Sequence, residues 1–268
     1  MMGKIIKDHL NFLISLPDVP KRVISLVPSQ TEFLYDLGIE NQILGITKYC
    51  VHPEHFLKTK VRVGGTKNFK IEAIKVLNPD LIIANKEENN EDLILKLKQH
   101  YPVWVSDIKT MDDAYRMMSD LGEIFDKLPL AQNIINTIQT EFSEIPRPRR
   151  KIRTAYLIWR KPYMSVNHDT FISHMLDISG LENVFAGEES RYPEVTIEQI
   201  QAAQPELVML SSEPFPFSEK HLEELAAQLP DSSLLLVDGE MYSWYGSRLI
   251  ASAAYLKKIY ANVISTLE

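Results

Sequence analysis

Two segments of this chain combine aromatic and cationic side chains directly after a run that predicts a β-strand. In the first, Ile158–Ser165, the residues Trp159 and Tyr163 flank Arg160 and Lys161. Open α/β sheets bind ligands beyond the carboxyl ends of their strands. We therefore expect the two rings to act as stacking walls and the two cations to face an anion. An ordinary turn with an exposed tryptophan is the alternative.

The second segment, Asp238–Arg248, has the same character and the same position after a strand. Tyr242, Trp244 and Tyr245 place three aromatic rings in four residues. Arg248 stands where the last helix should begin, and the start of a helix already favours anions. This predicts a second set of ligand contacts, with aromatic packing in the core as the alternative.

Other reactive side chains do not form a convincing centre. Cys50, His52 and His55 are soft and imidazole groups at short spacing, which suits zinc, but no fourth ligand is evident. A catalytic Cys–His pair would need a third group to orient the base. Ser29 follows a strand without the flanking glycines of a nucleophile elbow. We predict no metal centre, no cofactor and no enzyme activity.

The elements that position these segments occur twice. Residues 71–83 and 197–209 align without a gap at an offset of 126, which pairs Glu72 with Glu198. Residues 38–41 and 180–183 form a second aligned pair at an offset of 142. Two long copies are not a solenoid, which stacks short repeats. They predict two similar lobes with a cleft between them.

Short apolar runs alternate with helical periodicity in both halves, which is typical of parallel α/β sheets. We expect Rossmann-like lobes. Ser29 and Glu32 have the spacing of a capping box at a helix start. The predicted strands are 23–27, 43–47, 81–84, 103–106, 154–158, 207–210 and 234–237. The predicted helices are 71–77, 91–99, 112–125, 130–145, 171–178, 197–203, 219–229 and 248–266.

One amphipathic helix over 130–145, broken at Pro146, is expected to join the lobes. A helix is a stiffer connection than a Gly/Ser linker. We therefore divide the chain into an N-terminal lobe at 1–126, a bridging helix at 127–149 and a C-terminal lobe at 150–268.

Composition limits the classes of function. The 268 residues carry a net charge of −7, which gives no basic face for nucleic acid. The single cysteine allows no intrachain disulfide, and no run of 18 apolar residues exists. The first 17 residues contain Lys7, Asp8 and His9, so they do not read as a signal peptide.

The order of several motifs resembles the vitamin B12 and ferric-siderophore binding proteins of ABC importers, the class III periplasmic binding proteins. The similar blocks are 21–32, 62–67, 71–72 and 78–83, within a resemblance spanning about 17–260. This resemblance implies two α/β lobes bridged by one helix, with a metal chelate held between them. It also implies that Glu72 and Glu198 dock onto arginines of a permease.

The resemblance places Pro28, Tyr49, Thr66, Asn85 and Tyr192 at the ligand cleft. Vitamin B12 binders of the family carry tryptophans at the positions of Thr66 and Asn85, and those flat walls are missing here. The candidate loops instead carry many cations, which suit carboxylate or catecholate oxygens. These cations are Lys48, Lys67, Lys86, Arg160, Lys161, Arg191 and Arg248.

We therefore expect the monomeric substrate-binding component of an ABC importer, with a ferric siderophore favoured over cobalamin or haem. Its expected location is the periplasm or cell envelope. The alternative is a leaderless cytoplasmic protein that reuses the fold as a chelate chaperone or an enzyme. That alternative rests on the absence of a signal peptide between Met1 and Pro17.

Overall fold

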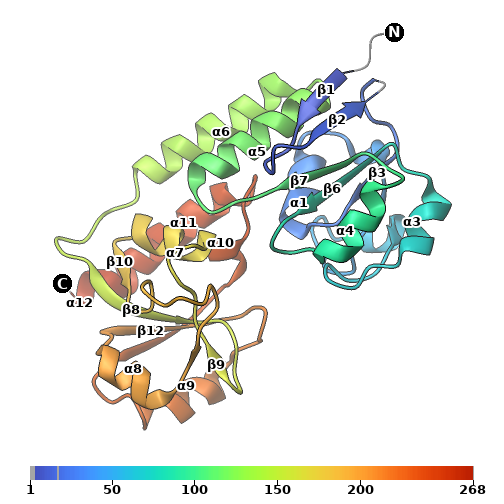
Figure 1. Ribbon diagram of the computed structural model, residues 1–268. Coiled ribbons are helices and arrows are strands. Elements are labelled where there is room, and N and C mark those ends of the chain that lie inside the picture. Colours follow the sequence, from blue (N-terminus) through green and yellow to red (C-terminus); the bar gives the residue numbers. More distant parts are fainter. Residues whose placement is uncertain (1–3, 17, 268) are drawn as a thin grey trace. The chain divides into compact units, whose positions relative to one another are not determined.

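The computed structural model describes residues 4–16 and 18–267, so Met1–Gly3 and Pro17, at the ends of the segment considered as a signal peptide, lie outside the described residues. The chain forms two compact units (Figure 1). Unit 1 comprises 1–108, 112–138 and 245–248, and unit 2 comprises 109–111, 139–244 and 249–268. The division falls inside helix α6 (Leu128–Ser143), in the region predicted to bridge the lobes.

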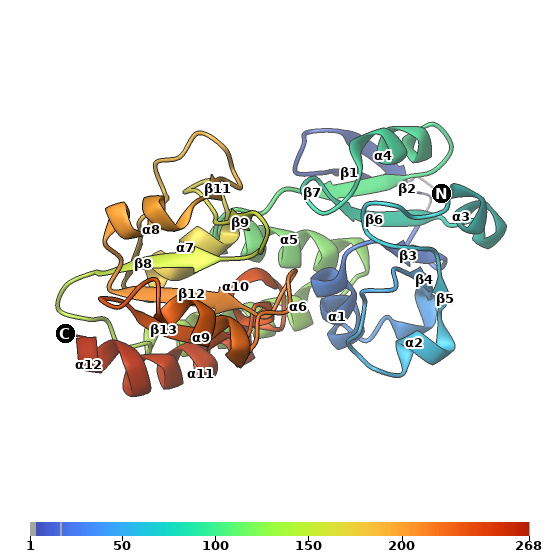
Figure 2. The same cartoon turned by 90° about the horizontal axis from the view of Figure 1, so that it is seen from below.

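Unit 1 is built on a parallel sheet with the strand order β5-β4-β3-β6-β7 (Figure 2). Apolar residues of β3, β6 and β7 pack against Ile74 of α3 and against Ile94 and Leu97 of α4. The strands are β3 (Val23–Ser25), β4 (Ile43–Ile46), β5 (Val61–Arg62), β6 (Leu81–Asn85) and β7 (Val103–Ser106). The helices are α1 (Pro28–Asp36), α2 (Phe56–Thr59), α3 (Ile71–Leu77), α4 (Glu91–Lys98) and α5 (Met111–Ile124), with a 3₁₀ turn at Glu40–Gln42.

An antiparallel hairpin of β1 (Lys4–Lys7) and β2 (Leu13–Leu16) precedes this sheet. No pattern in the sequence predicted this hairpin. The Asp8 carboxylate builds its turn by accepting hydrogen bonds from the backbone N–H groups of Leu10 and Phe12, at 2.9 and 2.8 Å. The backbone N–H of His9 donates to the Val105 carbonyl at 3.1 Å, which joins the turn to β7.

Unit 2 contains a parallel sheet with the strand order β10-β8-β12-β13. Its strands are β8 (Ile152–Leu157), β10 (Leu181–Asn183), β12 (Leu207–Ser211) and β13 (Ser233–Val237), beside a small ribbon of β9 (Tyr163–Met164) and β11 (Glu194–Val195). Its helices are α7 (Phe171–Ile178), α8 (Ile197–Ala203), α9 (Glu219–Ala226), α10 (Glu240–Ser243) and α11 (Leu249–Ile259), followed by a π-helical turn (Tyr260–Ile264) and α12 (Ser265–Leu267).

The two sheets have matching orders, because β4-β3-β6-β7 of unit 1 corresponds to β10-β8-β12-β13 of unit 2. Gly38 and Gly180 end equivalent helices with φ values of +73° and +75°, a conformation that glycine adopts without strain. The structure confirms the predicted α/β class with two similar parallel-sheet lobes. Among the described residues, no helix is both long enough and apolar enough to span a bilayer.

The predicted capping box at Ser29 is wrong. Helix α1 begins at Pro28, and its N-cap residue Val27 makes no side-chain cap hydrogen bond. Proline suits the first helical position, where its missing N–H would have no partner within the helix. Ser29 therefore lies inside the first turn.

Candidate functional site

An aromatic surface lies beyond the carboxyl end of β8 in unit 2, and we define it as Trp159, Tyr163 and Phe215. The Trp159 side chain is 40% exposed, and its ring meets Phe215 edge-on with 5.7 Å between centroids. The Phe215 ring packs in turn on Phe217 at 4.8 Å. A flat apolar ligand face could stack on this surface.

Backbone hydrogen bonds hold the two loops of the aromatic surface together. The Ile158 N–H donates to the Met164 carbonyl at 2.9 Å, which folds the loop after β8 back on itself. The Phe215 N–H donates to the Ile158 carbonyl at 3.3 Å, which brings in the loop after β12. Both loops follow parallel strands, whose carboxyl ends share one sheet edge.

Two of the three candidate cations of unit 2, Arg160 and Arg191, are ion-paired with carboxylates of that unit. Arg160 Nη2 lies 2.5 Å from Glu224 Oε2. Asp169 pairs with Lys109 at 2.6 Å and with Arg191 at 3.5 Å, and its pKa is lowered mainly by the hydrogen bond from Lys109. These pairs weaken the expectation that the cations face an anionic ligand.

In unit 1 the loops after β4 and β5 lie side by side. The Lys48 N–H donates to the Gly64 carbonyl at 2.8 Å. The Tyr49 side chain is 51% exposed, with the Lys48 ammonium 4.8 Å from the centroid of its ring. A Cβ atom on Gly65 would collide first with Asn68 Oδ1 and would also lie 3.3 Å from Tyr49 Cε2, so glycine leaves room for both side chains. Thr66, half-buried in the same loop, accepts a hydrogen bond from Asn89 Nδ2 at its carbonyl, at 3.1 Å.

The paired glutamates occupy equivalent places on equivalent helices. Glu72 is the second residue of α3 and Glu198 the second residue of α8. Both helices have seven residues, and both end on a left-handed residue other than glycine. The two side chains are exposed, that of Glu72 to 83%. Each glutamate is therefore presented to solvent in the first turn of a short helix.

Two arginines that no sequence pattern indicated form hydrogen bonds with the C-terminal ends of these helices. Arg22 donates from Nη2 to the Leu77 carbonyl at 2.5 Å and from Nε to the Asn78 carbonyl at 3.0 Å. Arg153 does the same in unit 2, with the Ala203 carbonyl at 2.5 Å and the Gln204 carbonyl at 3.4 Å. A cation at a helix C-terminus stabilises the helix dipole and pairs with carbonyls that have no partner within the helix.

Comparison with known proteins identifies this arrangement. A family model described as "Periplasmic binding protein" matches residues 23–230. The chain belongs to the periplasmic binding protein family. A vitamin B12-binding protein of Vibrio parahaemolyticus is 29% identical over 195 residues, which cover 71% of this chain and 70% of that protein. A vitamin B12-binding protein of Pectobacterium atrosepticum is 25% identical over 246 residues, or 88% of this chain and 86% of the relative.

Solved structures share the fold of this periplasmic binding protein. The periplasmic vitamin B12 binding protein BtuF of Vibrio cholerae superimposes with a TM-score of 0.75 at 22% identity, covering 92% of this chain and all of that one. The apo periplasmic haem-binding protein RhuT of Roseiflexus sp. RS-1 gives 0.78 at 16% identity, covering 90% and 97%. These relatives are binding proteins, and this member of the family is likewise a binding protein rather than an enzyme.

Two aromatic residues predicted to touch ligand lie inside unit 2 of this binding protein. Tyr242 is fully buried, with its ring 5.4 Å from that of Tyr156. Trp244 is 8% exposed, and its indole N–H donates to Glu213 Oε1 at 3.0 Å. The burial of both rings agrees with core packing, the alternative weighed for this segment. Burial raises the pKa of the Glu213 carboxyl, although hydrogen bonds from Ser243 and Trp244 act against the shift.

Asn85 and Pro28, which the resemblance places at the ligand cleft, are both buried. Asn85 builds the loop after β6: its side-chain oxygen accepts hydrogen bonds from the N–H groups of Glu87 and Glu88, at 2.8 and 3.0 Å. Its amide donates to the Ser106 hydroxyl at 3.0 Å. The side-chain oxygen and one of the two amide N–H donors are thus committed to internal hydrogen bonds.

Two observations bear on the ligand role predicted for Arg248. It belongs to unit 1, although the sequence analysis placed it in the same lobe as Arg160. Its guanidinium makes a two-pronged ion pair with Glu32, at 2.6 and 2.9 Å, and so neutralises an acid of α1. The neighbouring Tyr245 donates to Glu88 at 3.0 Å. Tyr192 is half-buried and stays a candidate, together with Tyr49, Thr66, Trp159 and Tyr163.

The weak metal candidates do not converge. The Cys50 thiol is buried 3.2 Å from the hydroxyls of Thr31 and Thr47, and burial raises its pKa to about 11. Metal ligation needs the thiolate. His55 Nε2 instead contacts Glu40 at 2.7 Å. In the described part of the chain, no three His, Cys, Asp or Glu side chains gather as a metal ion would require.

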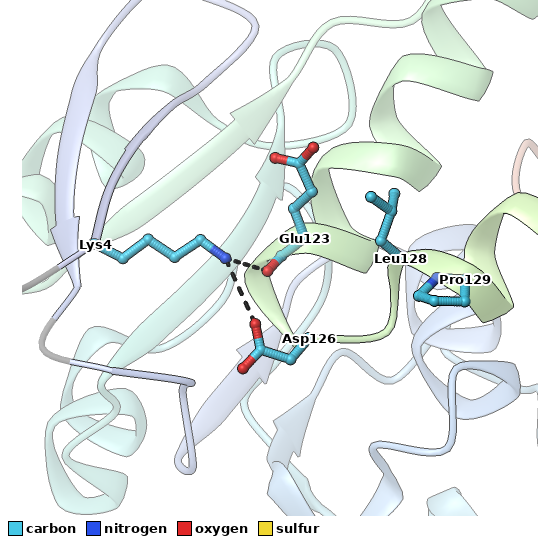
Figure 3. A pocket seen from close by; sticks show the side chains of 5 residues that line it. All are labelled: Lys4, Glu123, Asp126, Leu128 and Pro129. Atoms are coloured by element: carbon cyan, nitrogen blue, oxygen red, sulfur yellow. Dashed lines mark hydrogen bonds and ion pairs between the residues drawn. The ribbon is translucent and has the colours of Figure 1, made fainter.

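A shallow hollow in unit 1 lies apart from every candidate residue. It is lined by Lys4, Glu123, Asp126, Leu128 and Pro129 (Figure 3). The Lys4 ammonium donates to the Glu123 carbonyl and lies 3.8 Å from Asp126. The Lys4 ammonium thus has two acceptors at the C-terminal end of α5, and these contacts attach the β1–β2 hairpin to that helix.

Proposed function

We propose that this protein is the substrate-binding component of an ABC importer and that it carries a corrinoid or a related tetrapyrrole chelate. The main supporting observation is the aromatic surface of unit 2, where the exposed Trp159 ring lies beside the half-buried rings of Tyr163 and Phe215. Stacking on aromatic rings suits a large planar macrocycle. The names of the sequence relatives, which are vitamin B12-binding proteins, support the same class.

Cobalamin replaces a ferric siderophore as the favoured ligand in this proposal. The siderophore hypothesis depended on cations gathered for an anionic chelate. Arg160, Arg191 and Arg248 instead pair with carboxylates of the protein. Exchanging a protein carboxylate for a ligand carboxylate gains little, since one charge-assisted bond replaces another. An uncharged macrocycle periphery avoids that exchange.

Haem is the second candidate, and Tyr49 is the observation that favours it. An exposed phenol is one of the groups that ligate haem iron in proteins. Tyr49 is 51% exposed at the tip of its loop. A ferric haem bound through Tyr49 would lose its charge-transfer absorption in a Tyr49→Phe variant, whereas cobalamin binding would not change its spectrum in that variant.

Partner and location belong to the same proposal. Glu72 and Glu198 would dock on cationic residues of the permease, one from each unit. Two separated charge pairs set orientation and speed up association more than they add affinity. The family works in the periplasm, so we propose that location here, and cell fractionation of the native gene product tests it.

A titration panel tests the ligand. Cyanocobalamin, haem and ferric siderophores would each be added while intrinsic tryptophan fluorescence is followed. The chain has three tryptophans, of which Trp159 is the exposed one. We expect the Kd for cyanocobalamin or haem to be below about 1 μM, near −8 kcal/mol. Tight binding of a siderophore alone would refute the choice, and no binding below about 100 μM would refute the function.

A further inference from the structure

Helices α3 and α8, which carry the two glutamates proposed to dock and are called the docking helices below, match in length and in their left-handed end. They differ at their exposed positions. Residues 70–77 of the α3 segment read KIEAIKVL and residues 196–203 of the α8 segment read TIEQIQAA. The first carries two lysines and one glutamate, for a net charge of +1, and the second carries one glutamate, for −1. A permease with the same charged residues at both contact sites would therefore meet two helix segments of opposite net charge.

The glutamates themselves are engaged differently. Glu72 Oε1 lies 2.8 Å from the Lys75 ammonium, three residues further along α3. Glu198 accepts hydrogen bonds from the Thr196 hydroxyl and from its own backbone N–H, which lower the pKa of its carboxyl. Among the residues that the structure describes, no lysine or arginine pairs with Glu198. The Glu198 carboxylate is therefore ionised and available to a cationic partner. The Glu72 carboxylate, in contrast, already pairs with a lysine of its own helix.

An apolar side chain distinguishes the α3 end further. Val76 stands one turn after Glu72 and is 84% exposed. The equivalent residue of α8 is Ala202, which is smaller. Single exposed apolar side chains are common, but this one shares a helix face with a docking residue at i,i+4 spacing. A partner seated on Glu72 would cover it.

We propose that the two ends dock by different forces. The α8 end docks electrostatically, because the Glu198 carboxylate pairs with a cationic pocket of the permease. The α3 end docks chiefly by apolar contact of Val76, and Glu72 contributes only after it exchanges Lys75 for a permease cation. The inference rests on the proposed docking role of the two glutamates. Its consequence is that the ends are not interchangeable, which fixes one orientation on the permease.

The test uses the full chain loaded with its chelate and the ABC permease–ATPase complex of its own organism in liposomes. Stimulated ATP hydrolysis gives the half-maximal concentration of binding protein at about 50 and 300 mM NaCl, because salt screens exposed charges. We expect Glu198→Gln to raise that concentration about tenfold at low salt and to flatten the salt dependence. Val76→Ser should raise it about fivefold at both salts. Val61→Ser, at an exposed valine of β5 outside the docking helices, is the matched control.

The Lys75→Gln variant should dock more tightly than the unmodified protein, because it leaves the Glu72 carboxylate without its lysine partner. Releasing Glu72 should lower the half-maximal concentration about two- to threefold at low salt, and Glu72→Gln should cost less than Glu198→Gln. Equal costs and equal salt dependence for the two glutamate variants, or no effect of Val76→Ser, would overturn the asymmetry. Retained function in the Glu72→Gln, Glu198→Gln double variant would instead remove the docking role itself. Unchanged circular dichroism and chelate Kd exclude misfolding in each case.

Discussion

Replacing Trp159 with alanine should weaken binding of cyanocobalamin strongly. A tryptophan side chain offers up to about 250 Å² of surface. Since 40% of Trp159 is exposed, roughly 100 Å² remains for a ligand to cover. At about 25 cal/mol per Å², covering it contributes about 2.5 kcal/mol, or close to 70-fold in Kd. Ordering costs at the loop reduce the net effect, so we expect about 10- to 70-fold.

Isothermal titration calorimetry with cyanocobalamin measures this loss directly. Trp159→Phe should recover most of the affinity, because a smaller ring still stacks. Phe12→Ala removes another exposed ring, on the turn of the β1–β2 hairpin, and should leave the Kd unchanged. A Kd for Trp159→Ala within twofold of the unmodified protein, with its fold intact, would show that the aromatic surface does not touch the ligand.

Three further predictions address charge and backbone. Arg160→Ala should change the chelate Kd less than threefold by calorimetry, since its guanidinium is committed to Glu224; a loss above tenfold would restore the anionic-ligand hypothesis. Burial raises the folded-state pKa of Glu213 above its unfolded value, so native protein binds this proton more tightly and loses stability as pH rises from about 4.5 through the raised pKa. Glu213→Gln keeps an acceptor for Ser243 and Trp244, so its melting temperature relative to the unmodified protein should increase between pH 4.5 and pH 8; a constant difference would contradict this. Gln204→Gly should stabilise unit 2 towards urea by about 0.5–1 kcal/mol, because relieving a left-handed φ of +47° outweighs the added freedom of the unfolded chain. Asn78→Gly should gain less, since asparagine tolerates that conformation, and equal gains would show that strain is not the cause.

The sequence predicted the fold where local signals agreed. Helices at 71–77 and 197–203 were placed to the residue, because apolar periodicity is followed by proline in both copies. The β1–β2 hairpin was missed because its strands have four residues each and interrupt their apolar pattern with lysine and serine. Such short strands depend on a partner that local sequence does not reveal.

The surroundings of the predicted site residues were not evident from the sequence, because burial and ion pairing are set by contacts distant in sequence. Arg248 and Glu32 are 216 residues apart, so no local pattern indicates their ion pair. Tyr242 and Trp159 both follow strands among other aromatic residues, yet one is buried and the other exposed. Phe215 lies in a proline-rich loop after β12, and its position beyond a strand end was the available signal.

Differences in the repeat offset connect the fold with the proposed function. The offset is 131 between Arg22 and Arg153, 142 between Gly38 and Gly180, and 126 between Glu72 and Glu198. Unit 2 therefore has eleven more residues between its arginine and its glycine, the interval that contains Trp159 and Tyr163.

Unit 1 has sixteen more residues between Gly38 and Glu72, the interval that contains Tyr49 and Thr66. Loops are tolerated as insertions because closing a longer loop costs little free energy. The glutamates that we propose to dock and the arginines that bond the ends of their helices lie in the parts that repeat, while these four ligand candidates lie where the copies differ in length. Repetition thus accounts for an exposed glutamate on a similar helix in each unit, and the unequal insertions account for different candidate ligand residues in the two units.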